Sequence, residues 1–188
     1  MLNKFYSVLV VTFLSVSVSA QESDLGSCTF SKPKTYSYGN VSRSQCGTPK
    51  KGYRESIYFN GSPILSDTQL FDDDSNNDRS VRIYTSGSSN TATGCAPRLY
   101  LIDFSKQPVK VIAFGVKKAC NEFHWASWGE KRSVIALKHN VKFTYENGKM
   151  ILPKAGEKLW SSIEPPHAGE GLAMEDAIPF AEDVPPPK

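Results

Sequence analysis

The sequence RLYLIDFSKQPVKVIAFGV, residues 98–116, decides the fold. Two runs rich in aliphatic, β-branched and aromatic residues, 98–104 and 109–116, flank the polar turn Ser105-Lys106-Gln107-Pro108. Short runs of this kind with polar turns between them are typical of neighbouring antiparallel strands. The pattern continues, and further strands are expected at 121–128, 133–138, 141–145 and 149–152.

A turn signal and two earlier segments also favour antiparallel strands. Asn147-Gly148 lies between the last two runs and predicts a hairpin, because both residues accept the positive φ of a type I′ turn. Residues 53–59 and 79–85 also have strand character, whereas 21–52 is expected to be irregular. No stretch has a long helical period. We therefore predict an all-β fold, an antiparallel meander that forms either a sandwich or a distorted propeller-like body.

The first twenty residues predict an export signal. One charge, Lys4, precedes an apolar run from Val8 to Val18, which is too short for a bilayer core that needs roughly 20 apolar residues. The run ends in Val18-Ser19-Ala20, with small residues at the positions that a signal peptidase inspects. We expect residues 1–20 to be removed and the protein to work in the periplasm or outside the cell.

All four cysteines follow the predicted signal peptide. An even number of cysteines in an exported chain predicts two disulfides. Of the three connectivities, Cys28–Cys46 with Cys95–Cys120 is favoured because each bridge closes a local loop. The spacings do not fit a CxxC metal or redox site.

Charge and proline content divide the remaining chain into a body and a tail. Residues 21–163 have the length of one disulfide-stabilised β domain and carry 20 basic and 13 acidic residues. Residues 164–188 carry six acidic residues, one lysine and six of the twelve prolines. Because proline cannot donate a backbone hydrogen bond, this tail is expected to be extended or disordered and to form no strand, with a short helix at 172–177 as an alternative.

An acidic segment, residues 72–78, is the first candidate binding site. It reads DDDSNND and is expected to be a solvated loop. The residues that could attract a basic partner protein are Asp72, Asp73, Asp74 and Asp78. Calcium binding is a second interpretation, although the spacing lacks the mid-loop glycine and closing glutamate of an EF-hand.

An aromatic hairpin, residues 121–130, is the second candidate. A regular strand would place Phe123 and Trp125 on the face opposite His124 and Trp128. The expected partner contacts on the exposed side are His124, Trp128 and Glu130. Exposed tryptophans also serve as platforms for carbohydrate, which gives a second function for Trp125, Trp128 and nearby tyrosines.

The sequence gives little support to an enzyme. Glu122 and His124 could share one strand face and form a metal or acid–base pair, but a third ligand is lacking if Cys120 is in a disulfide. No Gly-x-Ser-x-Gly nucleophile elbow occurs. We therefore predict no catalytic residue, no metal site and no cofactor. Lysines scattered over separate segments predict no nucleic-acid partner and at most peripheral contact with a membrane.

The layout resembles a known group of proteins. A signal peptide, Cys28-Thr29-Phe30 near the mature N-terminus, short strands and disulfides are similar to periplasmic immunity proteins that protect bacteria from cell-wall-degrading effectors of type VI secretion. The stretch from Leu99-Tyr100-Leu101-Ile102-Asp103-Phe104 through Gly129 to Asn147-Gly148 also resembles propeller blades. This resemblance implies a partner-occluding, non-enzymatic role and assigns no functional residue.

The sequence is therefore compatible with three functions. The first is a periplasmic protein that occludes another protein, an immunity protein or inhibitor of a cell-wall-degrading toxin or hydrolase. The second is a secreted carbohydrate- or envelope-binding module. The third is a metal-dependent hydrolase built around Glu122 and His124.

Overall fold

The computed structural model describes residues 27–48, 50, 52–87, 98–116, 121–138, 141–153 and 178–187. The predicted signal peptide, Cys95, Cys120 and the alternative helix at 172–177 lie outside these residues. Within them every regular element is a β-strand, which confirms the all-β prediction. No helix in the described part of the chain is long and apolar enough to cross a membrane.

The strands form three antiparallel sheets, which we name A, B and C. Sheet A contains β1 (Cys28–Phe30), β2 (Lys34–Tyr36), β3 (Gly39–Thr48), β4 (Gly52–Phe59) and β5 (Ser62–Asp67). Sheet B has the order β14-β9-β8-β7-β6 and contains β6 (Leu70–Asn76), β7 (Val81–Ser86), β8 (Leu99–Asp103), β9 (Lys110–Val116) and β14 (Pro179–Asp183). Sheet C contains β10 (Phe123–Trp128), β11 (Arg132–Leu137), β12 (Lys142–Glu146) and β13 (Lys149–Ile151).

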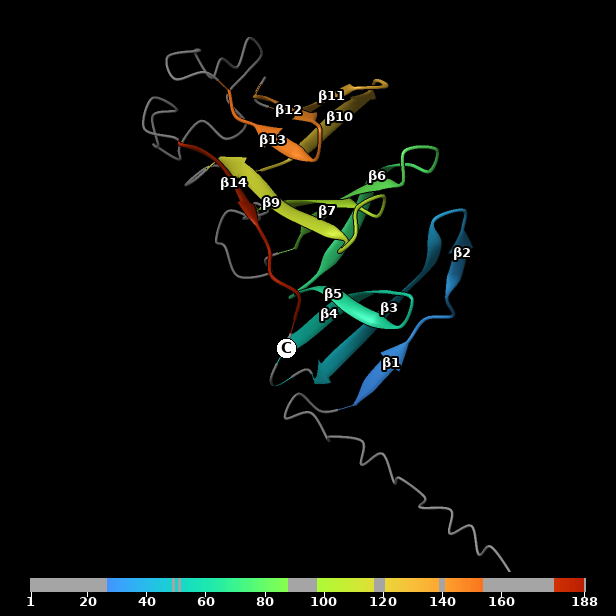
Figure 1. The fold of residues 1–188 in the computed structure, drawn as a ribbon. Coiled ribbons are helices and arrows are strands. Elements are labelled where there is room, and N and C mark those ends of the chain that lie inside the picture. Colours follow the sequence, from blue (N-terminus) through green and yellow to red (C-terminus); the bar gives the residue numbers. More distant parts are fainter. Residues whose placement is uncertain are drawn as a thin grey trace, which may run out of the picture.

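The sheets stack as three layers with sheet B in the middle (Figure 1). One hydrophobic cluster joins sheet B to sheet C, and a second joins sheet B to sheet A. Each sheet keeps two edges in the described part of the chain, so the strands close neither into a barrel nor into a propeller there. The body is a layered stack of meanders.

Sheet B is buried on both faces because successive side chains of a strand point to opposite sides. One set of side chains packs against sheet C and includes Val81, Ile83, Leu99, Leu101, Ile112, Phe114 and Val116. The alternate set packs against sheet A and includes Tyr84, Tyr100, Ile102, Val111 and Ala113. The continuous apolar runs that identified these strands in the sequence follow from this double burial.

The N-terminal segment differs from the prediction. Residues 21–52 were expected to be irregular, but the described part of this segment contains β1, β2 and β3. These strands contain few apolar residues, and β3 includes glycine and asparagine, which are depleted in strands. The segment is extended because β3 pairs with β4 from Val41↔Phe59 to Thr48↔Gly52. Tertiary pairing, which the local sequence does not show, explains the error.

The acidic segment also differs from the prediction. Residues 72–78 were expected to be a solvated loop, but Leu70–Asn76 is strand β6, paired with β7. Leu70 is buried in the core, while most of the acidic residues lie exposed on the sheet edge. A β-bulge between Asp72 and Asp74 interrupts the pairing and changes the face on which the following side chains lie.

The C-terminal tail contains a strand that the proline content argued against. β14 pairs with β9 from Pro179↔Val116 to Asp183↔Ile112, and the Val184 N–H donates to the Val111 carbonyl at 2.9 Å. Pro179 is the first residue of this edge strand, and Pro185 follows its end, so neither proline interrupts the ladder. The strand fits between the prolines, and it covers the edge of β9.

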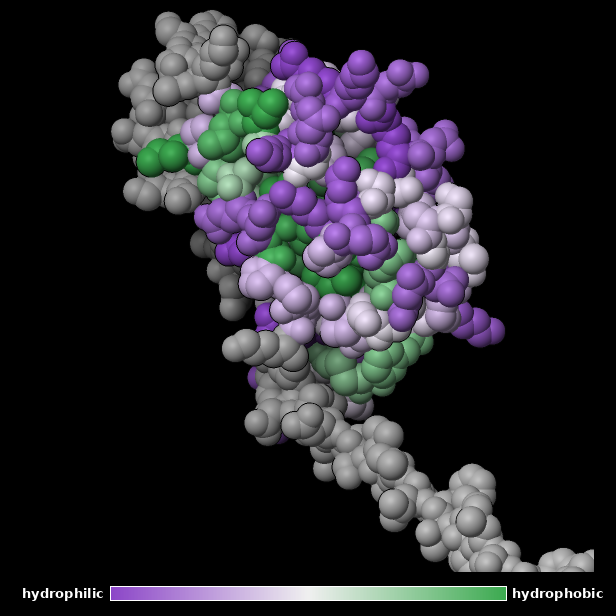
Figure 2. Space-filling view, viewed as in Figure 1, coloured by the Kyte–Doolittle hydropathy of each residue, from purple (hydrophilic) through white to green (hydrophobic). Residues whose placement is uncertain are grey.

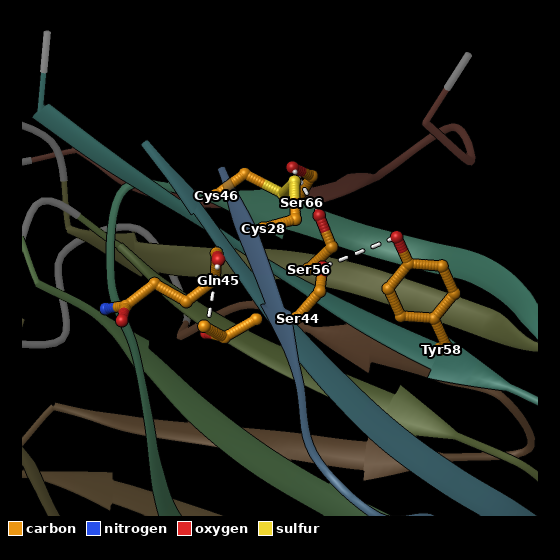
Figure 3. The surroundings of a disulfide bond; sticks show 8 residues. Cys28, Ser44, Gln45, Cys46, Ser56, Tyr58 and Ser66 are labelled. Atoms are coloured by element: carbon orange, nitrogen blue, oxygen red, sulfur yellow. Dashed lines mark hydrogen bonds between the residues drawn. A yellow bond between two sulfur atoms is a disulfide. The ribbon is translucent and has the colours of Figure 1, made fainter. Parts of the chain in front are cut away.

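The first disulfide and the predicted hairpin are confirmed. Cys28 and Cys46 are bonded and lie opposite each other in β1 and β3 (Figure 3). The two cysteines are 18 residues apart in the sequence. A disulfide that closes a loop of this length stabilises the fold by about 3 kcal/mol in the chain-entropy model. Asn147 and Gly148 have φ values of 52° and 76°, as a type I′ turn requires.

The B–C cluster gives a test of the layered core. Phe114 is fully buried, and its ring meets Phe143 edge-on with centroids 5.3 Å apart. Phe114→Ala should lower the free energy of unfolding by about 4 kcal/mol through lost burial and a residual cavity. Denaturant unfolding followed by fluorescence measures this change. Phe71→Ala, at a ring that is 55% exposed, is the control and should have little effect; an equal loss in both variants would contradict the layered core.

Candidate functional site

The two predicted binding segments lie side by side in the structure. The Trp128 Nε1–H of β10 donates to Asp74 Oδ2 of β6 at 3.2 Å, across 54 residues of sequence. Both strands are the outermost strands of their sheets in the described part of the chain. We call this surface, built from the side chains of Leu70–Asn76, the following turn with Asp78, and Phe123–Trp128, the β6–β10 edge.

The three consecutive aspartates have three different partners. Asp72 Oδ2 accepts a hydrogen bond from Arg82 Nη1 at 2.7 Å and forms a salt bridge with it. Asp73 accepts from the Thr85 hydroxyl. Asp74 accepts from Trp128 and, at 2.7 Å, from the Ser75 backbone N–H. The bulge therefore directs neighbouring carboxylates apart and keeps them from converging on one point.

This divergence bears on the calcium interpretation. A calcium site needs several carboxylate or carbonyl oxygens directed at one centre. In the described residues, no group of three His, Cys, Asp or Glu side chains is placed to hold a metal ion. Each of the three aspartates instead contacts its own partner within the protein.

Arg82 is the buried cation behind this surface. Its side chain is only 8% exposed, its Nε–H donates to the Tyr38 hydroxyl at 3.1 Å, and its guanidinium lies 4.4 Å from the centroid of the Tyr36 ring. Burial acts to lower the Arg82 pKa, but the Tyr38 hydrogen bond and the charge of Asp72 outweigh it and hold the pKa above its ordinary value. Arg82 therefore stays charged, and it fixes Asp72 and the β2–β3 turn against sheet B.

Asp73 is electrostatically different from its neighbours. Partial burial is the main cause that raises its pKa, and the charges of Asp72 and Asp74 add to this, against the Thr85 hydrogen bond. A raised pKa means that the ionised form of Asp73 costs stability in the folded protein. A partner cation that meets Asp73 would relieve part of that cost.

The aromatic hairpin differs from the predicted facing. The register of β10 shifts between Phe123↔Leu137 and Trp125↔Ala136, so His124 sits at a β-bulge. As a result Phe123, Ala126 and Trp128 pack on the B–C core, and Trp125 lies on the other face, 38% exposed. A regular alternation was assumed, and the extra residue makes that assumption wrong.

The remaining predicted residues are surface groups. His124, Glu130 and Asp78 are exposed, and Glu122 forms an ion pair with Lys138. The structure thus brings Asp74 and Trp128 into contact and leaves His124, Glu130 and Asp78 open to solvent. The acid–base pairing considered for Glu122 and His124 has its carboxylate engaged by a lysine.

Phe71 is a surface residue that the sequence reasoning missed. It is 55% exposed on β6, directly before the aspartates. Treating 72–78 as a loop hid the strand that begins at Leu70, where a buried and an exposed apolar residue alternate. That alternation was the available signal.

Comparison with family models, with curated protein sequences and with solved structures finds no match to this chain.

The aspartates allow a matched test of this description. Asp72→Asn should lower the free energy of unfolding by about 2 kcal/mol, because it removes the charge opposite the buried Arg82. Asp73→Asn should raise it at pH 7, because the neutral amide avoids the cost of ionising Asp73 and still accepts from Thr85.

The pH dependence of the unfolding free energy shows whether ionisation of Asp73 causes the gain in stability. The gain from Asp73→Asn should be present above the folded-state pKa of Asp73 and disappear below the ordinary Asp pKa of about 3.9, where the wild-type carboxyl is neutral in both states. Urea unfolding of both variants from pH 3 to pH 7 provides the measurement. Equal losses in the two variants at pH 7 would refute the assignment of different roles.

Proposed function

We propose that this chain is an exported, non-enzymatic protein that binds and occludes a partner protein through the β6–β10 edge, as an immunity protein or inhibitor of a cell-wall-degrading toxin or hydrolase. The observation that carries the proposal is Phe71, a 55% exposed aromatic ring on an edge strand. The residue opposite Phe71 in β7 is Thr85, whose hydroxyl donates to the exposed Asp73. A central aromatic anchor with a charged rim is the usual arrangement of an energetically important protein contact.

The scaffold supports such a role because it is preorganised. Asp72 and Asp74 are fixed by Arg82 and Trp128, and β6 belongs to the sheet that is buried on both faces. A surface that is already ordered loses less conformational entropy on binding. The bulge and the carboxylates also disfavour the addition of a partner strand to β6, so recognition would use side chains.

The negative charge of the β6–β10 edge favours a basic partner protein. Asp73, which accepts from Thr85, and Asp78, in the turn after β6, form no salt bridge among the described residues, and a basic protein would complement their charge. Such complementarity mainly increases the association rate and makes it salt-dependent. A hydrolase that binds the anionic cell wall would have suitable basic surfaces.

The compartment is the remaining part of the proposal. The Cys28–Cys46 disulfide indicates an oxidising environment outside the cytoplasm. With the N-terminal export pattern, this supports the periplasm. The resemblance in layout to immunity proteins points in the same direction.

The test uses the wild-type chain, Phe71→Ala and the double variant Asp73→Asn/Asp78→Asn as baits. Proteins retained from the producing culture by the wild type are purified, assayed on isolated cell walls and tested for binding to each variant. We expect a cell-wall hydrolase whose activity falls in the presence of the wild-type chain. Phe71→Ala should weaken binding by about tenfold or more.

Association kinetics then separate the roles of the anchor and the rim. The double Asn variant should bind more slowly at low salt and match the wild type at high salt. Glu182→Gln, at an exposed carboxylate on β14 at the opposite edge of sheet B, is the matched control and should change nothing. A captured protein that Phe71→Ala still binds fully, or that keeps full hydrolase activity when bound, would refute the proposal.

A further inference from the structure

The outer face of sheet C carries a second set of exposed side chains, separate from the β6–β10 edge. Residues directly opposite in neighbouring strands share one face of a sheet. Ala126, Ile135 and Phe143 are opposite one another and pack on the B–C core. The rows between them lie on the other face of the sheet: Trp125–Ala136–Lys142, Ser127–Val134–Thr144–Ile151 and Arg132–Glu146–Lys149. Ala136 is buried and Val134, Thr144 and Glu146 are half-buried, and the other residues of these rows are exposed.

The chemistry of these rows is aromatic and cationic. Trp125 is 38% exposed, and Lys142 Nζ lies 5.8 Å from the centroid of its ring. Arg132 Nη2 donates to the Thr144 hydroxyl at 3.4 Å, which turns the guanidinium toward the middle of the face. Glu146 is the one carboxylate in these rows, and it lies between Arg132 and Lys149. Lys142 lies in the row of Trp125 and has no carboxylate opposite it in these rows, so its charge is available beside the ring. Figure 2 shows hydrophilic residues over much of the part of the molecule where sheet C lies, with a hydrophobic patch beside them.

The size of the face decides between a protein and a smaller ligand. Four strands spaced about 4.8 Å apart, each about five residues long at about 3.3 Å per residue, make a face of roughly 250 Å². A stable protein interface buries about 800 Å² on each partner. A protein partner would have to extend well beyond this face, whereas a short linear ligand fits within it.

We propose that the outer face of sheet C binds an acidic glycan, with one sugar ring on Trp125 and the carboxylates of the chain at Lys142 and Arg132. A sugar ring presents C–H groups on its flat side and hydroxyls at its rim, which suits an exposed indole on a flat sheet. Exposed lysine and arginine supply the charge, and the Thr144 and Ser127 hydroxyls supply hydrogen-bond partners. This site is independent of the occlusion proposed for the β6–β10 edge.

The test measures binding to the full chain by calorimetry with three probes of equal length: a linear decamer of galacturonic acid, a neutral linear glucan decamer and decaglutamate. The acidic glycan should bind, and its affinity should fall as salt is added. Trp125→Ala and Lys142→Gln should each weaken binding by about tenfold, whereas Lys142→Arg should retain it. Lys34→Gln, at an exposed lysine on β2, and Phe71→Ala are controls and should leave binding unchanged.

Each alternative outcome is informative. Equal binding of the neutral glucan would show that the cations are not used, and equal binding of decaglutamate would favour an acidic protein; either result would overturn the proposal. So would absence of binding, or equal weakening by Lys34→Gln. Because Trp125 and Lys142 lie at the surface, unchanged unfolding curves of these variants should separate lost binding from lost folding.

Discussion

The double burial of sheet B is the constraint on which the rest of the structure depends. Side chains from both of its faces form the two hydrophobic clusters that join it to sheets A and C. Polar groups in such a layer need partners, because an unpaired buried polar group costs about 1–3 kcal/mol. Asp103 shows the solution: it accepts from the Tyr145 hydroxyl of sheet C at 2.5 Å and from the Ser105 backbone N–H at 2.9 Å. Sheet C and the turn after β8 thus satisfy this buried carboxylate.

This constraint leaves only edges and outer faces for contact with other molecules. At one edge of sheet B, β14 covers β9, and the Lys110–Asp183 ion pair adds to the strand pairing. At the other edge, the acidic strand β6 adjoins β10. The outer face of sheet C carries Trp125 and Lys142, with charge opposite to that of β6. A rigid stack with chemically distinct surfaces suits a binding protein, and both proposals follow from this division.

Much of sheets B and C, and strand β4 of sheet A, could be predicted from local sequence, whereas β1 to β3 could not. Strands β7 to β13 follow from apolar runs and polar turns, because a doubly buried strand has a strong local pattern. The β4–β5 hairpin had an equally clear signal in Asn60-Gly61, with φ values of 49° and 84°, which the sequence reasoning did not use. For β1 to β3, the residues are largely polar and the extended conformation comes from partners elsewhere in the chain. The candidate site was found in pieces: the aspartates and Trp128 were identified, but Phe71 and Arg82 were not.

The sequence by itself determined the all-β class, the Cys28–Cys46 bridge and the Asn147-Gly148 turn, because each rests on residues near one another or on a strong local preference. Only the tertiary structure decided which faces the side chains occupy. The bulges at Asp73 and His124 each insert one residue and reverse the alternation, so Trp128 faces the core and Trp125 faces solvent. Only the stacking of the sheets places Asp74 beside Trp128, because that contact depends on packing between strands 54 residues apart.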